Sequence, residues 1–219
     1  MNLDQARVNM IEQQIRPWNV LDQKVLDVLA EVPRDAFVAE QHLNLAYCDT
    51  AIGLGHGQSM LNPNVEGRIL QVLALQGNES VLHIGTGSGY LTACLAMLAK
   101  QVRSVDIIEE FTRAAARRLA SLSIDNVTLE SGDACHGWAP EARFDAIVIS
   151  GAVTSIPDAY REQLTVGGRL FAIVGRADQP IMEAVLTTRK SQNQWSTESL
   201  FETRTTCLQD VSAHDKFTF

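Results

Sequence analysis

The sequence has few cysteines, and they are not arranged as metal ligands. Its four cysteines, Cys48, Cys94, Cys135 and Cys207, lie far apart, with no Cys-x-x-Cys pair and no histidine at the spacing of a zinc site. This pattern predicts reduced thiols and no bound metal.

The sequence also lacks long apolar runs and an excess of basic residues. No stretch approaches the roughly 18 apolar residues of a membrane span, and the first residues show neither the basic start nor the apolar run of an export signal. With 18 basic against 26 acidic residues, the formal charge of −8 disfavours attraction to nucleic-acid phosphates. We therefore expect a cytoplasmic protein without a membrane or nucleic-acid partner.

The chain of 219 residues, 46% of them hydrophobic, can bury one substantial core. Apolar residues at helical spacing predict two helices before Pro33, the second capped by Asp22. Residues 47–63 carry alternate glycines without an apolar period, so we expect an irregular loop: a lid, a substrate wall or only a flexible connection. This organisation predicts an N-terminal helical segment and substrate loop over 1–64 and a core over 65–219, in one compact unit.

Strand and helix signals alternate after the helix that is expected to follow Pro63. Strands are predicted near 80–84, 102–106, 126–130, 144–150 and 168–174, and helices near 89–99, 109–122 and 157–165. Two last strands, near 181–189 and 195–202, suit an antiparallel hairpin. This order predicts a Rossmann-like α/β fold with a mostly parallel sheet, helices on both faces and a C-terminal hairpin.

A glycine-rich turn, Gly85-Thr86-Gly87-Ser88-Gly89, joins a buried strand to an apolar helix. Glycines allow a ligand to approach the main chain, and the helix N-terminus offers N–H groups to an anion. Asp106 follows Gly85 by 21 positions, at the end of the next strand, where its carboxylate can accept hydrogen bonds from both ribose hydroxyls. The pattern predicts a nucleoside-containing ligand, with a purely structural turn as the alternative.

Residue 90 narrows the identity of this ligand. Dinucleotide sites use Gly-x-Gly-x-x-Gly/Ala, but Tyr90 occupies the sixth position, where it would crowd the helix against the strand. The spacing suits a ligand without pyrophosphate, and S-adenosyl-L-methionine has an amino-acid tail in place of phosphates. Asp133 is either a partner for the adenine amino group or an ordinary turn residue. The small residues Ser150, Gly151 and Ala152 leave room where methyl group and acceptor meet.

Between about residues 25 and 179 the sequence resembles the protein-L-isoaspartate (D-aspartate) O-methyltransferase family. The matching segments, in order, are Val32-Pro33-Arg34-Asp35-Ala36-Phe37-Val38, Ala46-Tyr47-Cys48-Asp49, Gly55-His56-Gly57-Gln58-Ser59, Ile84-Gly85-Thr86-Gly87-Ser88-Gly89-Tyr90, Ser104-Val105-Asp106, Gly132-Asp133, Gln163-Leu164 and Gly167-Gly168-Arg169-Leu170. The resemblance implies a seven-stranded methyltransferase sheet. It also implies methyl transfer to the free carboxylate of isoaspartyl or D-aspartyl residues in damaged proteins, so the expected partner is such a protein or peptide.

Together, motif and resemblance predict a set of cofactor contacts, which are His83, Gly85, Thr86, Gly87, Ser88, Gly89, Asp106, Ile107, Gly132, Asp133, Ala134 and Ser150. His83 departs from the family, which usually carries an acid before the glycine loop.

The acceptor end departs from the family as well. In Gly57-Gln58-Ser59-Met60-Leu61-Asn62-Pro63, Leu61 aligns with the family's active-site serine, and a leucine cannot donate a hydrogen bond to a carboxylate. Ser59 keeps a hydroxyl and Asn62 an amide, so the candidate catalytic positions are 59, 61 and 62. A methyltransferase with another acceptor and a cofactor-binding module without isoaspartyl activity remain alternatives.

Overall fold

A seven-stranded sheet forms the centre of the computed structural model, which describes residues 2–209. The strand order is β5-β4-β3-β6-β7-β8-β9, in which the first five strands are parallel and β8 runs antiparallel to both neighbours. The strands are β3 (Ser80–Ile84), β4 (Gln101–Asp106), β5 (Val127–Ser131), β6 (Phe144–Val153), β7 (Leu164–Val174), β8 (Met182–Ser191) and β9 (Gln194–Thr203). The predicted mostly parallel α/β fold with a C-terminal hairpin is confirmed.

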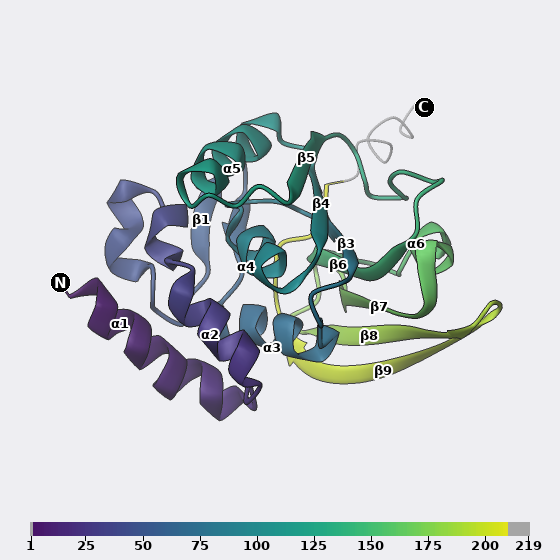
Figure 1. Cartoon of the computed structure of the whole chain (residues 1–219), viewed down its shortest axis with the longest axis horizontal. Helices are drawn as coiled ribbons and strands as arrows, with labels where there is room; N and C mark the ends of the chain where they lie inside the picture. Colours follow the sequence, from purple (N-terminus) through teal and green to yellow (C-terminus); the bar gives the residue numbers. More distant parts are fainter. Residues whose placement is uncertain (1, 210–219) are drawn as a thin grey trace.

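Helices lie on both sides of the sheet, as Figure 1 shows: α2, α4 and α5 on one side and α6 on the other. The helices are α1 (Leu3–Met10), α2 (Gln23–Glu31), α3 (Pro63–Leu73), α4 (Tyr90–Leu98), α5 (Glu109–Ser121) and α6 (Asp158–Gln163). Helix α4 contacts α2, α3 and β4, which explains why all but one of its residues are buried and why its sequence is almost entirely apolar. Among residues 2–209, no helix combines the length and apolarity needed to cross a membrane.

The N-terminal segment packs onto the core of the sheet. Helix α1 continues into the π-helical turn η1 (Ile11–Ile15) and the 3-10 turn η2 (Arg16–Trp18). Met10 and Ile15 are fully buried and belong to the same apolar cluster as residues of α3, α4 and the central strands. Asp22 caps α2 as predicted, because its carboxylate accepts a hydrogen bond from the backbone N–H of Lys24 at 2.9 Å. Two further 3-10 turns follow, η3 (Arg34–Phe37) and η4 (Glu40–Leu45).

The expectation of an irregular loop over 47–63 is wrong. The segment contains an antiparallel hairpin of β1 (Ile52–Gly55) and β2 (Gln58–Met60). Gly55 and Gly57 adopt positive φ around the turn, which glycine tolerates, and Ile52 lies opposite Met60, both buried. With 4 and 3 residues, these strands are too short to display an alternating apolar pattern.

Two core strands extend beyond their predicted ends. Strand β6 continues to Val153 through a register shift between Ile149 and Ala152, where Ser150 and Gly151 bulge from the ladder. Strand β7 begins at Leu164, before Gly167 and Gly168, which interrupt the apolar pattern at the predicted start of this strand. The bulge places Ser150 near the carboxyl end of β3, beside Gly85 of the glycine turn.

We expect Gly89→Ala to lower the free energy of unfolding by about 2–4 kcal/mol, measured by chemical denaturation. Gly89 has a φ of 90°, and a Cβ there would lie 2.8 Å from the Cβ of Ala115 in α5. Gly77→Ala is the matched control, because Gly77 has a φ of 96° but open space around it. The control should lose only about 1–2 kcal/mol; equal losses would contradict the role of close packing.

Candidate active site

A pocket lies beyond the carboxyl ends of β3, β4 and β6. The chain runs outward from β3 to β5 and then returns, so that β6 lies on the other side of β3. Such reversals of strand order create a crevice in which parallel α/β sheets bind ligands. The pocket has an empty volume of about 800 Å³ when the open solvent at its mouth is counted, and it is walled by the β1–β2 hairpin, the glycine turn, the start of α5 and the segment after β9.

The glycine turn sits tightly against the neighbouring strands. The N–H of Gly85 donates to the carbonyl oxygen of Val105 at 2.8 Å. Gly85 has a φ of 91°, and a Cβ at this position would lie 2.6 Å from Oγ of Ser150, so no larger residue fits. The main chain of this turn therefore forms the floor of the pocket next to the start of α4.

Asp106 places a carboxylate beside this turn, at the end of β4. Its Oδ2 accepts a hydrogen bond from the N–H of Gly87 at 2.8 Å, and its Oδ1 accepts one from the N–H of Ile108 at 2.9 Å. The side chain is largely buried, which raises the pKa of the carboxyl, while the backbone hydrogen bonds oppose the shift. Each oxygen retains a lone pair for a further donor, as recognition of two ribose hydroxyls requires.

His83 lies beneath the glycine turn and is neutral. Its Nδ1 is 2.9 Å from Oγ1 of Thr92, and its Nε2 is 3.2 Å from Oγ of Ser150. The Ser150 hydroxyl gives its single proton to the carbonyl oxygens of Ile84 and Gly85, so Nε2 of His83 carries the hydrogen that Ser150 accepts. Burial lowers the pKa of His83 to about 3. This histidine therefore positions the turn without adding charge to the pocket.

Two of the three candidate catalytic positions line the pocket. Ser59 and Leu61 both contribute to its wall, and the carbonyl oxygen of Leu61 accepts a hydrogen bond from Nη2 of Arg34 at 2.7 Å. Asn62 does not line it. Its amide donates to Oδ1 of Asp49 at 3.0 Å, and the residue precedes α3 as its N-cap. The structure thus places Ser59 and Leu61 in the wall of one pocket, whereas the Asn62 amide is bound to another partner.

Most of the predicted cofactor contacts line the pocket as well, but Gly89 and Asp133 do not. Gly89 begins α4 against α5, outside the pocket wall, and Asp133 accepts a hydrogen bond from the N–H of Cys135 at 2.9 Å beside a separate hollow near Trp138. The other predicted residues do line the pocket, namely His83, Gly85, Thr86, Gly87, Ser88, Asp106, Ile107, Gly132, Ala134 and Ser150.

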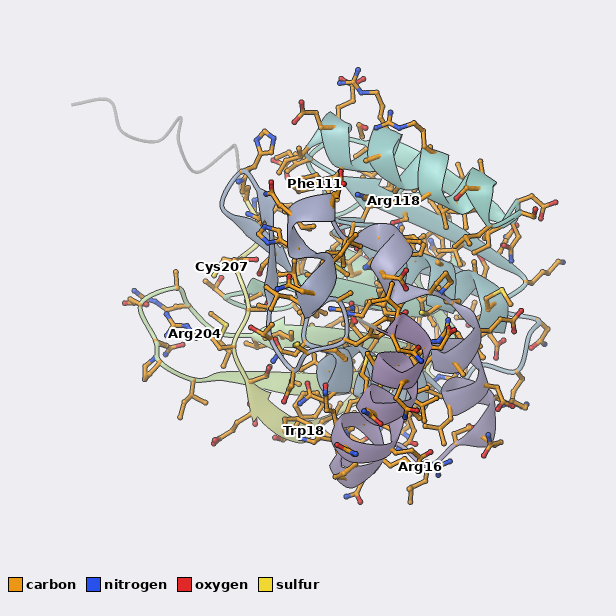
Figure 2. All side chains as sticks on the ribbon, turned by 90° about the vertical axis from the view of Figure 1, so that its left-hand side faces the viewer. Arg16, Trp18, Phe111, Arg118, Arg204 and Cys207 are labelled. Atoms are coloured by element: carbon orange, nitrogen blue, oxygen red, sulfur yellow. The ribbon has the colours of Figure 1, made fainter. Side chains whose placement is uncertain are left out.

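The segment after β9 also lines the pocket, although no sequence pattern predicted it. The N–H of Ala152 donates to the carbonyl oxygen of Thr206 at 2.9 Å, and the N–H of Leu208 donates to that of Ala152 at 2.9 Å. The Thr206 hydroxyl donates to Oε1 of Gln58 at 3.0 Å, which connects this segment to the hairpin. In Figure 2 the segment passes Cys207, and Phe111 at the start of α5 is labelled above it. No local pattern signals such a contact between distant segments.

Glu66 was also missed, although the sequence carried a signal for it. Glu66 lies on the helical face of Ile69, Leu70 and Leu73, so an acid interrupts an apolar stripe of α3. The residue is 3% exposed and lines the pocket, and its Oε2 accepts a hydrogen bond from Nη1 of the fully buried Arg34.

Together these features define a class of protein. A doubly wound sheet, a glycine turn without a pyrophosphate motif and an acid at the end of the next strand are the features of S-adenosylmethionine-dependent methyltransferases. Within residues 2–209, no group of three or more His, Cys, Asp or Glu side chains is arranged to hold a metal ion.

The chain belongs to the protein-L-isoaspartate(D-aspartate) O-methyltransferase family, whose model matches residues 5–210. It is 40% identical over 198 residues to protein-L-isoaspartate O-methyltransferase 1 of Rhodopseudomonas palustris strain HaA2, covering 90% of this chain and 80% of the relative. It is 41% identical over 175 residues to the protein-L-isoaspartate O-methyltransferase of Geobacter metallireducens, covering 80% and 81%. The chain is therefore an S-adenosylmethionine-dependent O-methyltransferase by family.

Solved structures share the fold along nearly the whole chain. A candidate protein-L-isoaspartate O-methyltransferase from Plasmodium falciparum, in complex with S-adenosyl-L-homocysteine, superposes with a TM-score of 0.78 at 19% identity. The match covers 95% of this chain and 99% of that one. Another protein-L-isoaspartate O-methyltransferase gives a TM-score of 0.80 at 22% identity, covering 94% and 66%.

The buried His83 should make stability depend on pH. The folded protein keeps this imidazole neutral, whereas the unfolded chain binds a proton below the ordinary pKa of 6.5. Stability is therefore fully present above that value and falls on acidification toward pH 3, by up to about 1.4 kcal/mol per pH unit. We expect His83→Gln to show a shallower decline in urea denaturation at about pH 7 and about pH 5. Identical slopes in the two proteins would contradict a neutral buried His83.

Proposed function

We propose that this protein transfers the methyl group of S-adenosyl-L-methionine to the free carboxylate of isoaspartyl or D-aspartyl residues in damaged proteins. The observation that carries this proposal is the family match across residues 5–210. Two curated relatives at 40% and 41% identity bear the name of this activity. The pocket supports the proposal because the residues expected to bind the cofactor, such as Asp106, and the candidate acceptor residues Ser59 and Leu61 line the same cavity.

The pocket residues fit the cofactor by shape and charge. Asp106 is suited to the ribose hydroxyls, and the backbone N–H groups at the start of α4, next to the glycine turn, are suited to the carboxylate in the amino-acid part of the cofactor. Gly132 and Ala134 border the expected adenine side with small side chains. When bound, the cofactor supplies a methyl group on a positively charged sulfur, a good leaving group.

The acceptor side needs positioning rather than acid–base chemistry. A substrate carboxylate is ionised at neutral pH, so one oxygen can form the new C–O bond while the S–C bond breaks and its electron pair returns to sulfur. Ser59 lies in β2, Leu61 directly follows this strand, and both residues line the pocket. The Ser59 hydroxyl is therefore suited to hold the second carboxylate oxygen where the family serine is replaced by Leu61. In this proposal residues 1–64 supply the acceptor wall and residues 65–219 the cofactor cradle.

An assay with methyl-labelled cofactor tests the proposal directly. We expect label transfer to an isoaspartyl peptide well above transfer to the same peptide with ordinary aspartate. Asp106→Ala should weaken cofactor binding in calorimetry by roughly 1–3 kcal/mol, because it removes a charged acceptor of hydrogen bonds.

The two measurements separate the cofactor from the acceptor. Equal label in both peptides would reject the isoaspartyl acceptor. Undiminished affinity in Asp106→Ala would reject the ribose assignment.

Leu61 supports a second candidate function, a methyltransferase with a different acceptor. An apolar side chain in place of the family serine gives no hydrogen bond to a carboxylate. Leu61→Ser should then raise kcat/KM for the isoaspartyl peptide by about 10-fold to 100-fold, the gain expected from one hydrogen bond to a charged group.

Leu61→Ala is the control for that variant, since it enlarges the pocket without adding a donor. An equal rise in both variants would attribute the effect to space. If kcat/KM did not rise in Leu61→Ser, Leu61 would not be the cause of low activity on isoaspartyl peptides.

A further inference from the structure

Glu66 is a buried residue in the wall of the pocket, and its carboxylate has a hydrogen-bond donor on one of its two oxygens. Arg34 occupies Oε2, and no group among residues 2–209 hydrogen-bonds Oε1. Burying a carboxylate costs free energy that a single ion pair often fails to recover. A charge kept on the apolar face of α3, and in the wall of a ligand pocket, therefore suggests a ligand as its second partner.

The pocket wall contains two carboxylates among the described residues, Asp106 and Glu66. Both oxygens of Asp106 accept backbone hydrogen bonds from Gly87 and Ile108, which fixes this group beside the ribose end of the site. The two acids thus differ in their surroundings, and only Glu66 is held by another side chain.

Strand β3 contributes no charge to the same region. His83 is a buried residue of β3, two positions before Gly85 of the glycine turn. Its two ring nitrogens lie within hydrogen-bond distance of the hydroxyl groups of Thr92 and Ser150. Because His83 stays neutral, a cationic group bound above the turn needs its counter-charge from another element.

We propose that Glu66 provides this counter-charge and binds the ammonium group in the amino-acid part of the cofactor. The inference rests on the proposed function, since it assigns one residue of that site. The assignment leaves complementary roles for the neighbouring elements: the start of α4 faces the cofactor carboxylate, and α3 supplies an acid for its ammonium. Arg34 acts as a positioning residue that fixes the orientation of the Glu66 carboxyl.

Titration of Glu66 gives the proposal a second signature. Burial raises the pKa of Glu66 to about 7, and the Arg34 guanidinium opposes this shift. Tyr90 and Cys94 of α4 also face this carboxyl, and burial raises the pKa of both, so they stay neutral near pH 7. Ligands with an ammonium group should therefore bind less tightly as the pH falls through about 7, because Glu66 must lose its proton to pair with them.

Calorimetry with two ligands tests the proposal. S-adenosyl-L-homocysteine contains the amino-acid part, whereas 5′-methylthioadenosine keeps the adenosyl thioether and lacks it. We expect Glu66→Gln to weaken binding of the first about 10-fold to 100-fold and binding of the second by less than about threefold. Between about pH 8 and about pH 6, the wild type should lose affinity for the homocysteine ligand, and the variant should not.

Glu31→Gln serves as the control, because it removes the same charge from an exposed position at the end of α2. Equal loss of both ligands in Glu66→Gln would indicate a structural role alone and overturn the proposal, as would unchanged binding of both. If wild-type protein bound neither ligand, the cofactor assignment itself would fail, so the two failures are distinguishable.

Discussion

A buried ion pair between Arg34 and Glu66 connects the parts of the chain that enclose the pocket. Arg34 lies on η3, Glu66 on α3, and the same guanidinium holds the backbone carbonyl of Leu61 at the end of the hairpin. It also lies over the ring of Tyr90 at the start of α4, 4.9 Å from the centroid. Removing one partner would leave an uncompensated buried charge, which is far more costly than the pair is stabilising. One side chain therefore contacts α3, the end of the hairpin and the start of α4.

The neutral His83 belongs to a chain of hydroxyl groups that supports this turn from below. Ser104 on β4 lies 2.7 Å from the Thr86 hydroxyl and 3.2 Å from that of Thr92, which in turn contacts His83. Hydroxyl groups both donate and accept, so the network is satisfied without ionisation. The consequence for the site is electrostatic: with an imidazole on β3, negative charge next to the turn comes from α3 and β4.

The sequence predicted features whose signal is local and missed those that depend on distant contacts. The Asp22 cap, the glycine turn and Asp106 follow from residue type and spacing within one βαβ unit. The hairpin was hidden because glycines break its short alternation, and the contact of Thr206 with β6 has no local pattern at all. Glu66 lies between these cases, since an acid on an apolar helical stripe was visible but its partner was not.

The apolar wall around Leu61 bears on how a carboxylate could react in this pocket. Leu54 and Phe111 line the same cavity, and the hairpin that carries Leu54 is held to α5 by a 2.7 Å contact between His56 and Glu110. Such walls exclude water, and a carboxylate that has lost its hydration is a stronger nucleophile toward the sulfonium methyl group. The same desolvation is costly unless one carboxylate oxygen keeps a donor. Under the proposed function, an apolar Leu61 is compatible with carboxyl methylation only while the neighbouring Ser59 hydroxyl remains, so the proposal treats residues 59 and 61 together.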